Sequence, residues 1–156
     1  MATIAVGKKI PAFSATATGG STIAARDLKG GKFVLFFYPR DNTPGCTVEA
    51  TDFRDLHAEF RRRKVTILGA SRDTLKSHEG FKQKFRFPFE LIADPDESLC
   101  NLFGVMKDKN MYGKKVRGIE RSTFLVDENG VVLREWRKVK VPGHAREVLD
   151  CLLEFP

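Results

Sequence analysis

The stretch KFVLFFYPRDNTPGCTVEATDF, residues 32–53, joins an apolar run to the start of a helix. Residues 33–38 are apolar on both faces and rich in aromatic side chains, which predicts a central, fully buried strand. Pro39 ends this strand. Thr43 and Pro44 then have the composition of a helix N-cap and first helical residue, so that Cys46 is expected as the third residue of a helix.

The rest of the chain alternates strand-like and helix-like segments. Phe53, Leu56 and Phe60 form a helical stripe that extends to about residue 63. The patterns then predict, in order, a strand at 64–71, a helix at 73–85 capped by Asp73, a strand at 89–94, a helix at 95–105 opened by Asp94 and Pro95, a hairpin at 121–138 that turns at DENG, and a helix at 144–155. Residues 10–32 predict an N-terminal β-hairpin. This order predicts an α/β fold with a central mixed β-sheet flanked by helices.

Composition and charge indicate one globular domain, residues 1–156, with 42% hydrophobic and 30% charged residues. The longest apolar run is too short to span a membrane, and MATIAVGKKIPAF lacks the apolar core of a secretion signal, so a cytoplasmic protein is expected. The net charge of +7 is scattered, and its densest cluster, RRRK at 61–64, complements the end of a predicted helix. We therefore expect no nucleic-acid and no membrane partner, and keep a basic nucleic-acid-binding module as an alternative.

The three cysteines, at positions 46, 100 and 151, are odd in number and widely spaced. This excludes a disulfide scaffold and a zinc site with paired ligands, and we expect neither a metal nor a cofactor. At a helix start, the sulfur of Cys46 would lie near unpaired N–H groups and the positive end of the helix dipole, which favours the thiolate. A small buried cysteine that happens to lie at a helix start explains the local pattern equally well.

A wider pattern distinguishes these two interpretations. Pro39, Thr43 and Cys46 form P-x-x-x-T-x-x-C, followed by Glu49, and this resembles the active-site signature of the peroxiredoxins. FYPRDNTPGCTVEATDFRD is similar to the subgroup called peroxiredoxin Q or bacterioferritin comigratory protein, and GASRD, SHEGF, NMYG and GIERSTFLVDENG extend the similarity over nearly the whole chain. The resemblance implies a thioredoxin-like fold and reduction of hydrogen peroxide and organic hydroperoxides by the thiolate of Cys46.

The resemblance also implies roles for four neighbours of Cys46. Pro39 would shield the thiolate, and the Thr43 hydroxyl would bond the sulfur and a peroxide oxygen. Arg121, in ERSTF, matches the family's arginine, and Glu49 would orient it. A guanidinium is suited to this role because it stays charged and can serve sulfur and oxygen together. From the residues alone, Arg121 would be a surface charge at the foot of a strand and Glu49 an ordinary first-turn carboxylate.

The catalytic cycle needs a second thiol, because a sulfenic acid must be condensed before it is over-oxidised. Many relatives carry this cysteine five residues after the first, where this chain has Thr51; others carry it in the segment aligned here with Lys82. Cys100 and Cys151 lie on apolar helix faces and are expected to be inert core residues. We therefore expect a monomeric one-cysteine peroxiredoxin reduced by an external thiol: thioredoxin, glutaredoxin or glutathione.

Two enzymatic alternatives stay open. In the first, Cys100 or Cys151 completes a two-cysteine mechanism. In the second, the protein is a thioredoxin-like disulfide oxidoreductase, although the C-x-x-C of that chemistry is absent because TVEA follows Cys46. His57, His78 and His144 are not placed by the sequence to act as the base of a Cys–His pair.

Overall fold

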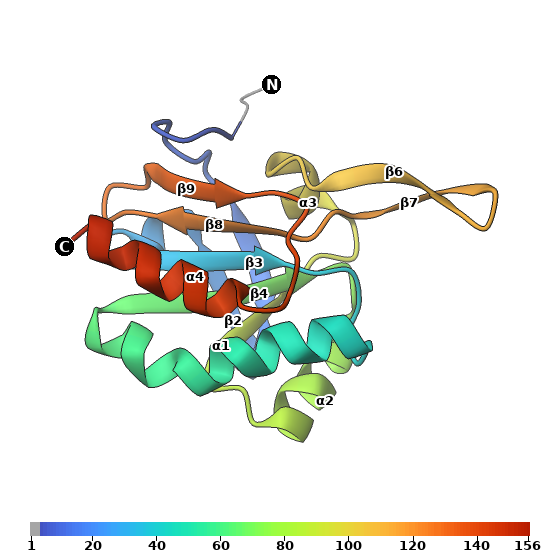
Figure 1. Cartoon of the computed structure of the whole chain (residues 1–156), viewed down its shortest axis with the longest axis horizontal. Helices are drawn as coiled ribbons and strands as arrows, with labels where there is room; N and C mark the ends of the chain where they lie inside the picture. Colours follow the sequence, from blue (N-terminus) through green and yellow to red (C-terminus); the bar gives the residue numbers. More distant parts are fainter. Residues whose placement is uncertain (1–3) are drawn as a thin grey trace.

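The computed structural model describes residues 4–156, which form a seven-stranded mixed sheet in the order β2-β1-β5-β4-β3-β8-β9 (Figure 1). The strands are β1 (Ser14–Ala17), β2 (Ser21–Ala24), β3 (Lys32–Phe37), β4 (Val65–Ser71), β5 (Glu90–Ala93), β8 (Ser122–Val126) and β9 (Val132–Trp136). Strands β3, β4 and β5 pair in parallel, and the outer pairs are antiparallel. The predicted mixed sheet is confirmed.

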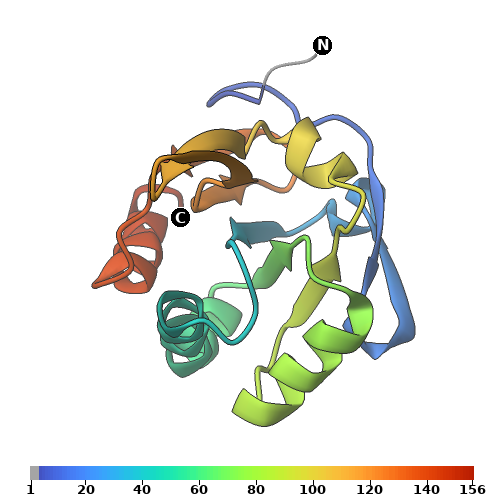
Figure 2. The ribbon, with the colours of Figure 1, turned by 90° about the vertical axis from the view of Figure 1, so that its right-hand side faces the viewer.

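Four helices cover the two faces of this sheet unequally. They are α1 (Pro44–Arg62), α2 (Leu75–Phe85), α3 (Ser98–Leu102) and α4 (His144–Cys151), with 3-10 turns η1 (Thr18–Gly20), η2 (Ala25–Leu28) and η3 (Leu152–Glu154). Helices α1, α2 and α4 supply one apolar cluster, and α3 packs into a second cluster on the opposite face (Figure 2). In the described residues, no helix is both long and apolar enough to cross a membrane.

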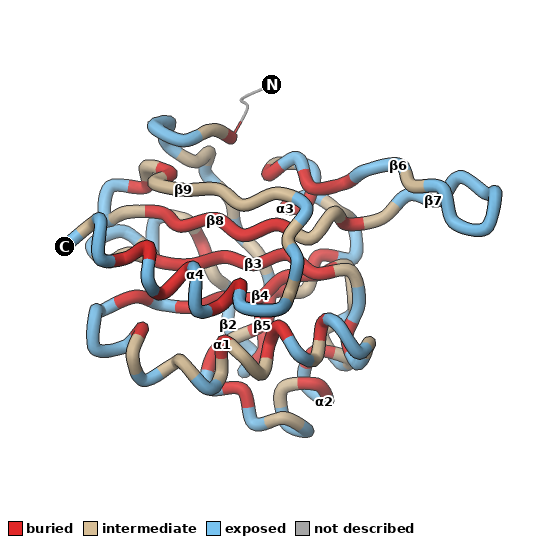
Figure 3. Tube along the Cα trace, in the orientation of Figure 1, coloured by how far each residue is buried: buried red, intermediate tan, exposed pale blue. Residues whose placement is uncertain are grey.

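Strand β3 lies at the centre and contributes to both clusters. Val34 and Phe36 face α1, α2 and α4, whereas Leu35 and Phe37 face α3, as the two-residue period of a strand requires. All four are fully buried, and the central strands form the buried band in Figure 3. An apolar run on both faces was therefore the correct signal for a central strand. The carboxyl end of β3 leads directly into the loop before α1.

The predicted DENG hairpin, N-terminal hairpin and C-terminal helix are also confirmed, but two predicted caps are wrong. Helix α2 is capped by Thr74, whose hydroxyl accepts from Ser77 N at 3.2 Å, while Asp73 bonds elsewhere. Helix α3 begins only at Ser98, because Pro95 and its neighbours form a turn. Asp94 still satisfies the helix start from a distance, with its carboxylate accepting from the backbone of α3.

A second, two-stranded sheet was not predicted. Strands β6 (Met106–Met111) and β7 (Lys114–Ile119) pair as an antiparallel hairpin that projects from the body of the molecule (Figure 1). Its residues are polar and largely exposed (Figure 3). The sequence therefore has neither an apolar run nor a clear alternation of apolar and polar residues that would predict these strands.

Candidate active site

Cys46 lies in the first turn of α1, as the sequence predicts. Thr43 is the N-cap, Pro44 is the first helical residue, and the Cys46 side chain is buried, with only 1% exposed. The Thr43 hydroxyl does not cap the helix: it donates to the Arg40 carbonyl at 2.8 Å. Pro39 is half-buried in the loop between β3 and α1. The sulfur is therefore shielded from solvent at the positive end of a long helix.

Arg121 approaches the same sulfur from far along the chain, where it precedes β8. Its Nη2 donates to Cys46 Sγ at 3.3 Å, and its Nη1 donates to Glu49 Oε1 at 2.7 Å. Gly45 leaves room for this approach, since a Cβ at that position would lie 3.3 Å from Arg121 Nη2. One guanidinium thus bridges the thiol and the carboxylate, and the structure brings together Cys46, Glu49 and Arg121.

The charges of this group are tightly coupled. Burial raises the pKa of Glu49 from 4.5 to about 7, against the opposing effect of Arg121. Burial also opposes the charge of Arg121, but Glu49 and Cys46 outweigh it and raise the pKa of the guanidinium. Glu49 Oε2 is buried without a hydrogen-bond partner among residues 4–156. The orientation of Arg121 therefore depends on a carboxylate whose ionisation is costly.

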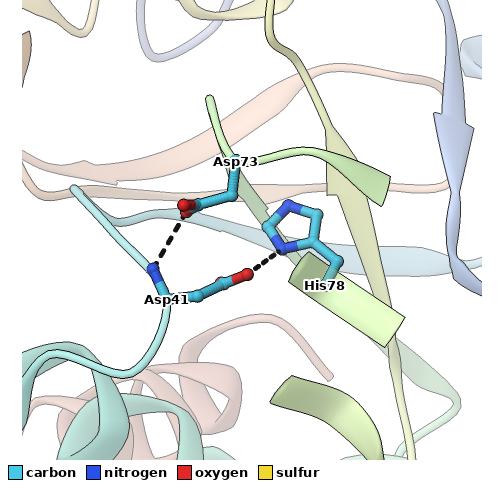
Figure 4. Close-up of side chains that lie close together, drawn as sticks. All are labelled: Asp41, Asp73 and His78. Atoms are coloured by element: carbon cyan, nitrogen blue, oxygen red, sulfur yellow. Dashed lines mark hydrogen bonds and ion pairs between the residues drawn. The ribbon is translucent and has the colours of Figure 1, made fainter. Parts of the chain in front are cut away.

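The loop that carries Pro39 and Thr43 is anchored on α2 through Asp41 (Figure 4). The Asp41 carboxylate accepts from Tyr38 Oη at 2.6 Å and from Ser77 Oγ at 2.8 Å, and it lies 2.8 Å from His78 Nδ1. Burial, followed by the charge of Asp41, raises the pKa of Tyr38 well above its ordinary value. These contacts fix the turn that positions the start of α1.

Two further contacts complete this network. His78 Nε2 lies 2.9 Å from the Ile92 carbonyl, which only accepts, so this nitrogen carries a hydrogen. Asp73 accepts from Asp41 N at 2.9 Å. Asp41, Asp73 and His78 place three potential metal-ligating atoms within 4.8 Å of one another. Because hydrogen bonds already occupy these groups, we interpret the cluster as a structural network.

Sequence reasoning left His78 outside the site, although SHEGF belonged to the family-like segments; that segment was the available signal. His144 is also buried, with Nε2 2.8 Å from Thr123 Oγ1, and burial lowers the pKa of its ring. Neither histidine is hydrogen-bonded to the sulfur of Cys46. The structure thus supplies an arginine, and not an imidazole, as the polar partner of the thiol.

The other two cysteines lie away from this site, and all three are free thiols. Cys100 belongs to the cluster on the opposite face of the sheet, and its burial beside Asp94 raises its pKa. Cys151 ends α4, at the end of the molecule remote from the start of α1 (Figure 1), and burial raises its pKa. Both have the buried, raised-pKa character of unreactive thiols.

The chain belongs to the AhpC/TSA family, whose model matches residues 6–134. It is 53% identical over 135 residues to peroxiredoxin Bcp of Xanthomonas campestris, covering 86% of this chain and 84% of the relative. It is 46% identical over 153 residues to peroxiredoxin Bcp of Bacillus subtilis, covering 98% of each. Within its family it is therefore a peroxiredoxin of the Bcp or peroxiredoxin Q type, a thiol-dependent peroxidase.

Solved structures agree with this assignment. A cysteine mutant of PrxQ from Xylella fastidiosa superposes with a TM-score of 0.93 at 40% identity, covering 99% of this chain and 98% of that one. The bacterioferritin comigratory protein of Xanthomonas campestris gives a TM-score of 0.87 at 49% identity, covering 91% and 90%. The expected thioredoxin-like peroxiredoxin fold is confirmed.

Proposed function

We propose that Cys46 is the peroxidatic residue. Its thiolate attacks one oxygen of a hydroperoxide, an S–O bond forms as the O–O bond breaks, and the leaving oxygen takes a proton to depart as water or an alcohol. The observation that carries the proposal is the Arg121 bridge, with one guanidinium nitrogen 3.3 Å from Sγ and the other held by Glu49. The thiols of Cys100 and Cys151 are less suited to this role, because burial raises the pKa of both.

The residues around Cys46 stabilise charge, orient Arg121 and shield the sulfur. Arg121 stabilises the thiolate and then the charge that develops on the leaving oxygen, and Glu49 orients Arg121. The Thr43 hydroxyl already donates to Arg40, so it offers peroxide an acceptor, in place of the donor expected from the sequence. Pro39, half-buried in the same loop, shields the sulfur from water.

The proposed substrates are hydrogen peroxide and organic hydroperoxides. The polar groups around the buried sulfur are few, one cationic donor and one hydroxyl acceptor, so they can recognise a hydroperoxide group without selecting the rest of the molecule. The structure of the Xanthomonas campestris relative was determined to explain its alkyl peroxide reduction activity. We extend that substrate class to this chain.

We further propose that an external thiol closes the cycle. In Xanthomonas campestris peroxiredoxin Q, two different cysteines were replaced by serine, and their separation, counted from Cys46, falls on Lys82. Thr51, the other usual position, is also not a thiol. Cys100 lies on the opposite face of the sheet, so it does not supply the second thiol. The reductant is therefore external: thioredoxin, glutaredoxin or glutathione. It acts on a monomeric, single-domain protein in the reducing cytoplasm.

The decisive experiment is stoichiometric peroxide reduction by reduced wild type and by Cys46→Ser, followed by intact mass. We expect wild type to consume one equivalent and to gain the mass of a sulfenic acid or of a mixed disulfide with added thiol. Retained consumption in Cys46→Ser would refute the assignment.

A second measurement separates the one-cysteine and two-cysteine cycles. Peroxide-treated wild type, Cys100→Ser and Cys151→Ser are compared on non-reducing gels and by mass. We expect no intramolecular disulfide in any of them. A disulfide in wild type that disappears in either variant would establish a two-cysteine mechanism instead.

A further inference from the structure

The β6–β7 hairpin projects from the end of the molecule at which α1 begins (Figure 1). Only Glu120 separates the last residue of β7 from Arg121, whose guanidinium touches Cys46 Sγ. The hairpin is therefore joined through a single residue to Arg121 of the proposed active site. We call residues 106–119 the basic arm.

The basic arm carries a strong excess of positive charge. Its cations are Lys107, Lys109, Lys114, Lys115 and Arg117, and its single acidic residue is Asp108. Two of these cations form contacts within the protein: Lys109 donates a hydrogen bond to the Ile119 carbonyl, and Arg117 forms an ion pair with Glu97. Lys107, Lys114 and Lys115 form no ion pair with any described residue. They are free to attract a negatively charged surface.

The tip of the arm exposes an aromatic side chain that contributes almost nothing to the fold. Tyr112 is 99% exposed, and its neighbour Met111 is 53% exposed. Tyr112 has a φ of 53° and Gly113 a φ of 78°, so they form a tight two-residue turn in which both positions are left-handed. Asn-Gly fits such a turn best, whereas a bulky aromatic residue is strained there. The backbone at Tyr112 is thus strained, and it holds the aromatic ring in a position where only a binding partner could bury it.

We propose that the basic arm is the docking site for an acidic protein dithiol that reduces oxidised Cys46. This inference rests on the proposed one-cysteine cycle, in which no thiol stands at Thr51 or Lys82. Aromatic and methionine side chains are enriched at protein interfaces, so Tyr112 and Met111 provide the contact. The free lysines accelerate the encounter by steering the acidic partner toward the end of the molecule that holds Cys46.

The reduction balances with the partner's two thiols. One partner thiolate attacks the sulfur of the sulfenic acid; an S–S bond forms, the S–O bond breaks, and the hydroxyl group takes one proton and leaves as water. The second partner thiol then attacks the mixed disulfide and releases the Cys46 thiolate. The partner ends as a disulfide, and each cycle consumes two of its electrons.

The test compares two reductants on the same variants. Steady-state peroxide turnover is measured with dithiothreitol and with a thioredoxin or glutaredoxin of net negative charge, each recycled by its own reducing system. The variants are Tyr112→Asn, which suits the turn, and the double substitution Lys114→Gln with Lys115→Gln. The charge control is Lys29→Gln, at an exposed position directly after η2 and before β3. We expect both arm variants to raise the KM for the protein reductant at least about tenfold. Turnover with dithiothreitol should stay at the wild-type value.

Ionic strength provides an independent measurement. We expect added salt to raise the KM of wild type and of Lys29→Gln for the protein reductant, and to affect the double lysine variant less. An unchanged KM in both arm variants would overturn the proposal. Equal losses of turnover with dithiothreitol would also overturn it, and so would turnover of wild type by dithiothreitol but not by the acidic protein reductant. Failure of wild type to consume peroxide with any thiol would instead refute the proposed function itself.

Discussion

Arg121 Nη1 lies 2.7 Å from Glu49 Oε1, and this buried ion pair turns the opposite edge of the guanidinium toward the sulfur of Cys46. The pair spans two elements, because Glu49 belongs to α1 and Arg121 precedes β8. A lysine could not reproduce the arrangement, since it presents a single nitrogen where the guanidinium presents a planar fork. The first prediction follows from this geometry.

Arg121→Lys keeps the positive charge but loses simultaneous contact with the thiol and Glu49. We expect the rate constant of peroxide reduction by Cys46 to fall by about two to three orders of magnitude, the usual cost of losing a transition-state donor. Single-turnover peroxide consumption measures it, with exposed Arg146→Lys on α4 as the control. A rate within threefold of wild type would show that charge alone is sufficient.

Glu49→Gln should remove a pH dependence of stability. Burial raises the pKa of Glu49 from 4.5 to about 7, so folded protein retains a proton that unfolded protein loses between these values. The contribution of this carboxyl to stability is therefore full below pH 4.5 and decreases as the pH rises to about 7. The total loss is on the order of 3 kcal/mol of unfolding free energy.

The measurement is urea unfolding of wild type and Glu49→Gln at several pH values from 4 to 8. We expect wild type to lose stability relative to the variant through this window, and the difference to become constant above about pH 7. The exposed Glu59→Gln, on the same helix, should show no comparable trend. A constant difference between wild type and Glu49→Gln across the range would contradict the burial argument.

The local structure around the candidate site could be predicted from the sequence where it depends on neighbouring residues. The apolar run of β3 and the Thr43–Pro44 helix start needed only strand period and cap composition, and both are confirmed. The contact of Arg121 with Cys46 joins positions 75 residues apart, and no local pattern encodes it, so only the family resemblance supplied it. The resemblance supplied the residue, but the ion-pair geometry came from the structure.

Other features could not be predicted from the sequence because they depend on contacts between segments far apart in the chain. Asp73 had good cap composition, but the backbone N–H of Asp41 attracts its carboxylate and leaves the cap to Thr74. His78 lay on an unremarkable helical pattern, and its importance arises from the loop that folds against it. The β6–β7 hairpin buries too little apolar surface to leave a periodic signal.

His78→Leu should loosen the active-site loop. The substitution removes the ring that bonds Asp41 and the Ile92 carbonyl, leaving a buried carboxylate with fewer partners. We expect about 3 kcal/mol of destabilisation, because a buried carboxylate and a buried carbonyl each lose a hydrogen-bond partner, together with slower peroxide reduction. Ser77→Ala removes a single hydrogen bond to the same carboxylate and should cost only about 1 kcal/mol. Equal effects of the two substitutions in urea unfolding would refute the central place of His78.

Glycine-to-alanine substitution should have opposite effects at two positions. A Cβ on Gly69, in β4, would lie 2.8 Å from Leu91 Cδ2 and 2.9 Å from Phe36 Cζ, both in the core. Phe36 stacks on Phe53 of α1 at 4.7 Å, so the strain would reach the helix that carries Cys46. We expect Gly69→Ala to destabilise the protein by about 1–3 kcal/mol.

Gly80, in α2, is the matched control, because a Cβ there would meet nothing within 4 Å. Alanine in an exposed helical position restricts the unfolded chain, and Gly80→Ala should stabilise the protein by up to about 1 kcal/mol. Urea unfolding of the two variants beside wild type measures both signs. A Gly69→Ala variant as stable as wild type would contradict the prediction. It would show that the side chains around Phe36 can shift by several tenths of an ångström at no cost in stability.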